Sequence, residues 1–391
     1  MESKFADADL AERVYRSVVK RVLNSGVCTM LFERCSRSNM WTSDYHCMLL
    51  RDFTRRSKPD PCQRGTCCWY VSFRNVSTID EPVTGQRAFI GKCNMNRNSP
   101  DSYREPSAED SVEATKVLIK YIHSLSSPLV HPIITPRFAI SCTDELLKSL
   151  GHLAASHPTM AIQTHISENK AEVAFTKELF PDRTSYADVY DHFGLLRDTT
   201  VLAHAVHLED DEKKLIKQRN AGISHCPDSN FNLSSGVAPV GEFLDLGIKV
   251  GLGTDVSGGT SVSILRAVQM ASVAAKTKAM QQPTPVTSGF ANRALSIATL
   301  LYLATLGGAE VCCLDKVIGS FEQGKQFDAL VVDIRDRFGG NPGLWGENLL
   351  DGLTEKQQLE TSLERFLFCG DDRNIRRVFV KGKCVAGFAK D

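Results

Sequence analysis

Apolar stretches of strand length alternate with stretches of helical period along most of the chain. Near the N-terminus, Val14, Val18 and Val22 recur at helical spacing and predict a helix over residues 7–24, followed by a strand over 27–32. Further along, the pattern predicts strands over 88–93, 130–135, 161–165, 200–204, 223–226 and 250–255. Between them it predicts helices over 108–124, 143–155, 169–179, 209–219, 238–246 and 261–276. Repeated strand–helix units predict a parallel sheet with covered faces, and a long series of them favours a (β/α)8 barrel over an open sheet.

Two parts of the chain depart from this alternation. Residues 33–84 show no sustained period and concentrate cysteine, tryptophan and arginine, so we interpret them as translated non-coding sequence or an alternative exon. The other interpretation is a surface insertion, although long structureless loops are uncommon in compact domains. Near the C-terminus, a strand is expected over 327–332 and a hairpin over 378–385. We therefore expect a barrel domain over residues 1–315 and a β-rich appendage with a closing helix and hairpin over 316–391.

The charge of this 391-residue chain is balanced, with 46 Lys and Arg against 46 Asp and Glu. That balance favours neither a nucleic acid nor a membrane surface as a partner. We expect no signal peptide, because the first residues lack its basic and apolar regions, and no membrane span, because no apolar run reaches about 18 residues. The 13 cysteines are expected to be reduced thiols in a cytoplasmic protein.

Polar side chains lie at the ends of several predicted strands, namely His165, His204, His225 and Asp255. In a parallel barrel the carboxyl ends of the strands face one mouth, where these side chains are expected to converge. A single histidine at a strand end is more often a structural residue. Several histidines and an aspartate, each closing an apolar strand, instead indicate an active site.

Glu168 adds a carboxylate just beyond His165, where the next predicted helix begins. A zinc ion held by neutral imidazole and carboxylate can lower the pKa of a bound water to about 7. A nearby glutamate can then accept the proton and deliver it to a substrate. The alternative interpretation of Glu168 is a charge at a helix N-terminus, which the helix dipole favours.

Several motifs occur together and in order along the chain. They are Thr135-Pro136-Arg137-Phe138, His165-Ile166-Ser167-Glu168-Asn169, Ala203-His204, Ser224-His225-Cys226-Pro227, Gly251-Leu252-Gly253-Thr254-Asp255, Leu303-Ala304-Thr305-Leu306-Gly307-Gly308-Ala309 and Gly370-Asp371-Asp372-Arg373-Asn374-Ile375. In these motifs the chain resembles the guanine deaminases of the amidohydrolase superfamily, over residues 1–30 and about 85–391. The resemblance implies a zinc-dependent hydrolase that converts guanine to xanthine and ammonia.

The resemblance also implies a role for each side chain at the strand ends. His165 and Asp255 ligate zinc, and Asp255 accepts a proton from the attacking water. Glu168 carries the proton to a ring nitrogen and on to the leaving amine, while His204 contacts the attacking water. Glu168, His204 and Asp255 are therefore the expected catalytic residues, and His225 is expected to support the pocket wall.

The substrate contacts implied by the resemblance come from two directions. The Arg137 guanidinium donates to acceptors on the purine, and the Phe138 ring stacks on the base. His165, Glu168 and Asp255 contact the substrate from the metal centre. The Arg-Phe pair favours guanine, while cytosine, a triazine or an adenosine derivative would be the substrate of an alternative aminohydrolase.

The chain departs from the family at one ligand pair. The family carries His-x-His at the end of its first barrel strand as zinc ligands, but none of the 10 histidines here forms such a pair. We therefore interpret the chain as N-terminally truncated, with a barrel that lacks its first strand and a C-terminal β-sandwich remnant. Because catalytic zinc normally keeps three protein ligands, His165 and Asp255 alone predict weak zinc binding and reduced turnover. A non-catalytic variant that associates with family subunits is the remaining alternative, since the family forms homodimers.

Overall fold

The computed structural model describes residues 8–34, 85–99, 104–256, 258–281, 288–335, 350 and 352–387. Residues 35–84, which make up nearly all of the segment interpreted as divergent, lie outside the described residues. Within the part that is described, no helix is long and apolar enough to cross a membrane.

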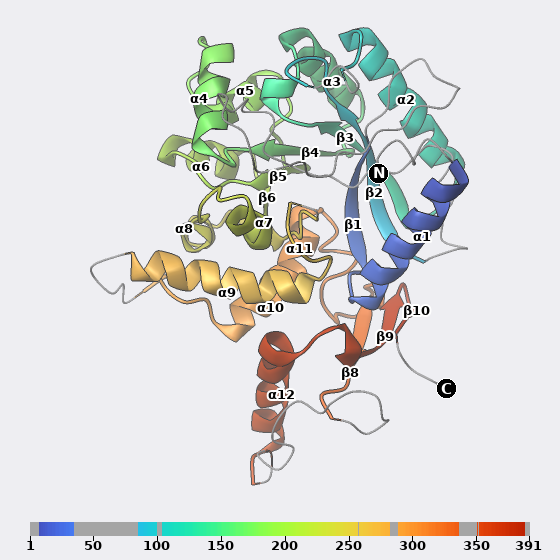
Figure 1. Ribbon diagram of the computed structural model, residues 1–391, viewed down its shortest axis with the longest axis vertical. Coiled ribbons are helices and arrows are strands. Elements are labelled where there is room, and N and C mark those ends of the chain that lie inside the picture. Colours follow the sequence, from blue (N-terminus) through green and yellow to red (C-terminus); the bar gives the residue numbers. More distant parts are fainter. Residues whose placement is uncertain are drawn as a thin grey trace, which may run out of the picture.

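A seven-stranded parallel sheet forms the centre of the molecule (Figure 1). Its strands neighbour one another in chain order: β1 (Thr29–Arg34), β2 (Arg87–Asn94), β3 (Val130–Pro136), β4 (Ala161–Ile166), β5 (Thr200–His204), β6 (Gly222–His225) and β7 (Lys249–Leu252). Among the described residues, no pairing joins β1 to β7. The α/β class with a parallel sheet, expected from the alternating pattern, is confirmed.

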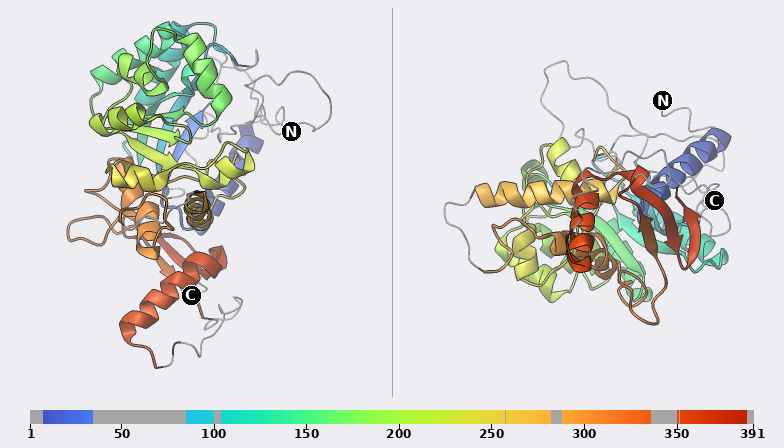
Figure 2. Two further views of the ribbon diagram at one scale, coloured as in Figure 1. Left: turned by 90° about the vertical axis from the view of Figure 1, so that its left-hand side faces the viewer. Right: turned by 90° about the horizontal axis from the view of Figure 1, so that it is seen from below.

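Helices connect the strands and lie around the outside of the sheet (Figures 1 and 2). They are α1 (Ala8–Asn24), α2 (Ala108–Ser124), α3 (Asp144–Ser156), α4 (Lys170–Leu179), α5 (Tyr186–His192), α6 (Asp210–Gln218), α7 (Pro227–Asn232), α8 (Val240–Asp245), α9 (Ile264–Met280), α10 (Ile297–Ala304), α11 (Leu306–Val311) and α12 (Glu355–Cys369). Several begin at a side chain that caps the free backbone N–H groups, as Ser107 does for α2 and Thr143 for α3.

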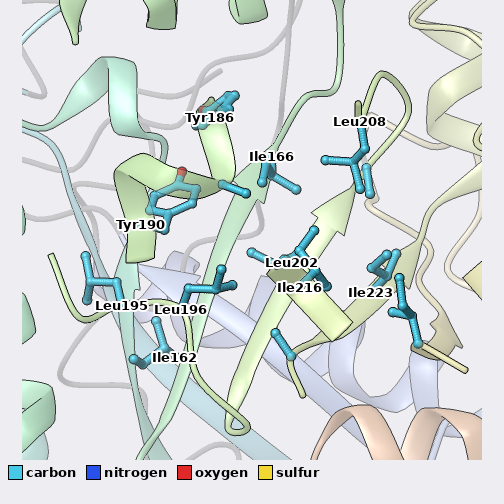
Figure 3. Close-up of a cluster of buried hydrophobic side chains, with 14 of the residues drawn as sticks. Ile162, Ile166, Tyr186, Tyr190, Leu195, Leu196, Leu202, Leu208, Ile216 and Ile223 are labelled. Atoms are coloured by element: carbon cyan, nitrogen blue, oxygen red, sulfur yellow. The ribbon is translucent and has the colours of Figure 1, made fainter. Parts of the chain in front are cut away.

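The main apolar core lies between the sheet and these outer helices. Figure 3 shows part of it, where side chains of β4, β5 and β6 meet those of α5 and α6; labelled there are Ile162, Ile166, Tyr186, Tyr190, Leu195, Leu196, Leu202, Leu208, Ile216 and Ile223. In β4, Ile162 and Ile166 belong to this core, whereas Gln163 and His165 alternate with them and point to the other face. The apolar period of the strand therefore fixes His165 on the inner face of the sheet.

A three-stranded antiparallel sheet follows, with β8 (Ala329–Val332), β9 (Ile375–Val380) and β10 (Lys383–Ala386) in the order β10-β9-β8. Together with α12 it lies at the opposite end of the molecule from α3 and α5 (Figure 1). Lys381 and Gly382 join β9 to β10 with φ of 51° and 77°, as a two-residue hairpin turn requires. The hairpin predicted over 378–385 is confirmed.

Candidate active site

The carboxyl ends of three strands bring His165, His204 and Asp255 together. His165 lies near the end of β4, His204 ends β5, and Asp255 follows β7. One ligand atom from each residue lies within 4.8 Å of the others. The sequence correctly predicts this convergence, although β7 ends at Leu252 and not at 255, so Asp255 stands on the loop beyond the strand.

His165 is held in one tautomer by the backbone. Its Nδ1 lies 2.8 Å from the carbonyl oxygen of Arg137, which can only accept, so Nδ1 carries the hydrogen. In the neutral ring the lone pair is then on Nε2. Burial, reinforced by the charge of His204, lowers the pKa of His165 well below its usual value, so the ring stays neutral.

His204 is fully buried, and its Nδ1 lies 2.9 Å from Oδ1 of Asn230. Its Nε2 lies 3.8 Å from Oδ2 of Asp255 and 3.9 Å from Oε2 of Glu168. Burial opposes protonation of this ring, but the carboxylates of Glu168 and Asp255 outweigh it and raise the pKa of His204. The ring stacks on that of His165 at 5.3 Å between centroids.

Asp255 is fixed by the helix before β7. Its Oδ2 accepts a hydrogen bond of 2.6 Å from the Ser229 hydroxyl on α7. Burial raises the pKa of Asp255 to about 6, although the charge of His204 and the hydrogen bond from Ser229 act against this rise. A Cβ added at Gly258 would lie 2.5 Å from the same Oδ2, so a side chain at position 258 would collide with this carboxylate.

Glu168 is 4% exposed and points towards this cluster. The Ser235 hydroxyl donates to its Oε1 at 3.1 Å, which leaves Oε2 facing His204. The alternative interpretation as a helix-terminal charge does not describe it, because Asn169 and Glu172 form the capping box of α4. The carboxylate of Glu168 is thus free of any capping role in this helix.

Arg137 and Phe138 follow β3 and adjoin the same cluster. The Phe138 ring lies 4.5 Å from that of His165, and the Arg137 guanidinium lies 5.3 Å from the Phe138 ring centroid. Nη1 of Arg137 is 3.7 Å from the sulfur of Met95. The structure therefore places both predicted substrate residues next to the strand-end cluster.

His225 ends β6 but does not belong to the cluster of His165, His204 and Asp255. It lines a small pocket with residues of α8 and α9, and neither ring nitrogen has a hydrogen-bond partner among the described residues. Burial, reinforced by the charge of His204, lowers the pKa of His225 to about 3, so this ring is neutral near pH 7. The expected supporting role of His225 therefore stays a prediction.

The sequence prediction missed the polar residues that orient this cluster, namely Ser229, Asn230 and Ser235. They lie on α7 and the loop that follows it, and each contacts a different member of the cluster. The one sequence feature that could have indicated a helix here is Pro227, because proline is frequent at the first position of a helix. The polar run after it otherwise resembles a loop.

Comparison with known proteins connects this geometry to a family. The profile described as "Amidohydrolase family" matches residues 74–385. A relative from Schizosaccharomyces pombe (strain 972 / ATCC 24843), "Probable guanine deaminase", is 42% identical over 99% of this chain and 65% of its own length. "Guanine deaminase" from Dictyostelium discoideum is 39% identical over 98% of this chain and 74% of its own. The chain thus spans slightly less than two thirds of the first relative and about three quarters of the second.

Among solved structures, a guanine deaminase from C. acetobutylicum with bound guanine in the active site is 31% identical. It superposes with a TM-score of 0.78 and covers 98% of this chain, while this chain covers 78% of that structure. The likeness extends across the parallel sheet and the strand ends that carry the cluster.

Proposed function

We propose, on the premise that this chain belongs to the amidohydrolase family of hydrolytic enzymes and to the guanine deaminases within it, that it hydrolyses guanine to xanthine and ammonia. The observation that carries the proposal is the convergence of His165, His204 and Asp255 within 4.8 Å. Glu168, Arg137 and Phe138 adjoin that cluster, as the chemistry requires.

The donor set fits a zinc ion, which is bound in proteins by imidazole nitrogen and carboxylate oxygen. His165 offers a neutral Nε2, and Asp255 offers a buried carboxylate. Zinc, when bound, would lower the pKa of the attacking water and so provide a nucleophile near neutral pH. Asp255 is also placed to accept a proton from that water.

Glu168 is the residue that moves the proton to the substrate. Its Oε1 is occupied by the hydrogen bond from Ser235, so Oε2 is the atom that accepts and releases the proton. Proton delivery to a ring nitrogen makes C2 of guanine more electrophilic, and a second delivery lets the amine on C2 leave as ammonia. Burial of the carboxylate excludes bulk water from this transfer.

Arg137 and Phe138 determine the choice of base. A guanidinium can donate two parallel hydrogen bonds to O6 and N7 of guanine, while adenine offers a donor in place of O6. Phe138, beside the His165 ring, provides an apolar face for stacking. Hydrogen-bonding discrimination of this kind favours guanine over cytosine or an adenosine derivative.

We also propose an incomplete barrel, a β-sandwich remnant and a homodimer for this chain. The seven strands would belong to an eight-stranded barrel that lacks its first strand, which the absence of pairing between β1 and β7 among the described residues supports. Strands β8 to β10 would be the remnant of a β-sandwich in an appendage over 316–391. The resemblance to guanine deaminases supports a cytoplasmic location and a homodimer. Sedimentation of the purified chain would test the dimer.

Loss of guanine absorbance, followed with purified chain and added zinc, tests the activity. We expect turnover that falls by roughly 10²- to 10⁴-fold in Glu168→Gln, the usual contribution of a positioned acid–base group. Glu178→Gln, which makes the same change at an exposed position of α4, should leave turnover unchanged. A folded, zinc-loaded chain without turnover would refute the proposal.

A further inference from the structure

A buried ion pair lies at the loop that follows β2. Lys92 belongs to β2, Glu105 precedes α2, and Nζ of the lysine contacts Oε1 of the glutamate. Both side chains are buried. A buried ion pair adds little net stability over apolar side chains of similar volume, because both charges must leave water. A role in fixing a local conformation explains the pair better than a role in stability.

The residue that this pair fixes is Met95. Oε2 of Glu105 accepts hydrogen bonds from the backbone N–H of Met95 at 3.0 Å and from the Ser111 hydroxyl at 2.5 Å. The backbone N–H of Glu105 donates to the Met95 carbonyl at 3.1 Å. Both backbone polar groups of Met95 are thus bonded to Glu105. The Met95 side chain is 1% exposed, so close packing also restricts its rotamer.

The sulfur of Met95 faces the residue that is proposed to recognise the base. It lies 3.7 Å from Nη1 of Arg137, and a thioether sulfur is a weak hydrogen-bond acceptor. The two backbones are joined as well, because the N–H of Arg137 donates to the Asn94 carbonyl at 3.2 Å. A contact that selects one arginine rotamer reduces the entropy that is lost when a ligand binds.

The residues after Met95 hold the loop that begins with Arg137. Asn96 and Thr143 exchange two hydrogen bonds of 2.9 Å, one from the Asn96 amide to Oγ1 and one from the Thr143 N–H to Oδ1. The Asn98 amide donates to a backbone carbonyl of the same loop, that of Ile140, at 2.8 Å. The loop after β2 therefore fixes the loop after β3 along its length.

We propose that the buried Lys92–Glu105 pair, acting through Met95, positions the Arg137 guanidinium and so sets the preference of this chain for a purine with an oxygen at C6. Met95 is the positioning residue that contacts Arg137, and Glu105 is the positioning residue that fixes Met95. The inference rests on the proposed function in one respect, the donation by Arg137 to O6 and N7 of the base.

Equilibrium binding of guanine and of 2-aminopurine to the full, zinc-loaded chain tests this assignment. All variants carry Glu168→Gln, so that guanine is not consumed. 2-Aminopurine keeps N7 and the amine of guanine but lacks O6, so a bidentate contact with the guanidinium is not available to it.

We expect Met95→Leu, which removes the sulfur acceptor, to weaken guanine binding by roughly 5- to 10-fold, the value of one hydrogen bond. Its effect on 2-aminopurine should be much smaller, whereas a merely structural role would weaken both ligands equally. Met95→Gln, which offers an amide oxygen, should restore much of the guanine affinity. Met160→Leu, which changes a buried methionine just before β4, is the matched control and should bind both bases as the parent does.

The ion pair is tested by Lys92→Met with Glu105→Leu, because this double variant leaves no buried charge unpaired and should stay folded. Its guanine affinity should fall by about as much as that of Met95→Leu, again with a smaller effect on 2-aminopurine. Adding Met95→Leu to the double variant should lower guanine affinity no further, since both changes act through one contact.

Two results would overturn the inference and leave the proposed function intact: equal losses for both ligands in Met95→Leu, or no loss for either. Binding that changes as expected, in a chain that does not convert guanine when Glu168 is restored, would contradict the proposed function alone. A folded, zinc-loaded parent chain that binds neither base would overturn both.

Discussion

His204, Ala205 and Asp255 take left-handed backbone conformations, with φ of 73°, 52° and 43°. Residues with side chains adopt this region at a cost of about 1–3 kcal/mol, and such strain gathers at functional sites. In β5 the alternation of side chains would place His204 on the outer face with Leu202, which packs in the main core. The left-handed turn at His204 interrupts that alternation, and its ring stacks on that of His165.

At the same scale, Glu172 makes stability depend on pH. Burial, reinforced by the charge of Glu168, raises the pKa of Glu172 to about 7, above the 4.5 of an ordinary glutamate. The folded state therefore holds a proton that the unfolded state releases. This contribution is complete below about pH 4.5 and is lost as pH rises to about 7, by on the order of 3 kcal/mol.

Urea unfolding at pH 5 and pH 8 measures this effect. Glu172→Gln keeps the oxygen that accepts from the backbone N–H of Glu168 but cannot ionise, so its free energy of unfolding should change less between the two values. Glu178→Gln, at an exposed position of α4, should keep the pH dependence of the parent chain. Equal pH dependence in Glu172→Gln and the parent would contradict the prediction.

Among the elements, α7 and the loop after it orient three parts of the site. Ser229 donates to Asp255, Asn230 accepts from His204, and Ser235 donates to Glu168. The three partners, Asp255, His204 and Glu168, stand on different strands or loops, so one short segment fixes their relative positions. This is an arrangement for pre-organising groups that act together in one step.

Loss of the serine hydroxyls should therefore lower turnover without unfolding the protein. Hydrogen bonds to charged groups contribute about 1.5–3 kcal/mol, so Ser229→Ala and Ser235→Ala should each reduce kcat by roughly 10- to 100-fold at saturating zinc. Because both serve one step, the double variant should lose less than the product of the two effects. Ser124→Ala, which removes an exposed hydroxyl, is the control; a fully multiplicative double variant would argue against a shared step.

The sequence predicts elements well where an apolar period exists and poorly where tertiary contacts determine the structure. The apolar face of α2 recurs at helical spacing, and its observed bounds, Ala108–Ser124, are those predicted. The helix α7 has no such period, since four of its residues, Pro227, Asp228, Ser229 and Asn230, are buried although most are polar. Contacts with α9 and hydrogen bonds to the loop after β7 stabilise it, and no local pattern encodes them. The sequence pattern also does not predict the short helix α5, which lies between two elements with clearer periods.

Across the whole molecule, a buried ion pair joins the parallel sheet to the small antiparallel sheet. Arg87 begins β2 and Asp328 precedes β8; their side chains are 1% and 6% exposed and lie 3.1 Å apart. Gln326 accepts a second hydrogen bond from the same guanidinium, and Asp328 also accepts from the backbone N–H of Lys381. The pair therefore links segments that are far apart in the sequence.

Replacing Arg87 alone should destabilise the folded state, because the charge of Asp328 would stay buried without its partner. We expect Arg87→Met to lower the free energy of unfolding by about 3–5 kcal/mol, and Arg87→Met with Asp328→Leu to recover much of that loss. Lys214→Met, which breaks an exposed pair with Asp211, should have little effect. Denaturant unfolding gives all three values, and a double variant no more stable than Arg87→Met would contradict the expectation.

At this scale the sequence predicts the parallel α/β class and the place of the site, because both follow from the order of strands and helices. It does not predict the link through Arg87, since a charged residue at the start of a strand resembles a solvent-exposed position. It also cannot give the inward turn of His204, which depends on backbone strain and not on period.

Arg137 contacts both His165, in the strand-end cluster, and Phe138, the proposed stacking surface for the base. Its carbonyl fixes the tautomer of His165, while its guanidinium lies beside the Phe138 ring where the base is proposed to stack. A base that immobilises Arg137 would therefore also immobilise the imidazole of His165, which is proposed to bind the metal. By thermodynamic reciprocity, any factor by which guanine tightens zinc binding is the factor by which zinc tightens guanine binding. If zinc and guanine bind as proposed, occupancy of the metal site would follow the supply of purine base, and the chain would hold zinc less firmly when no base is bound.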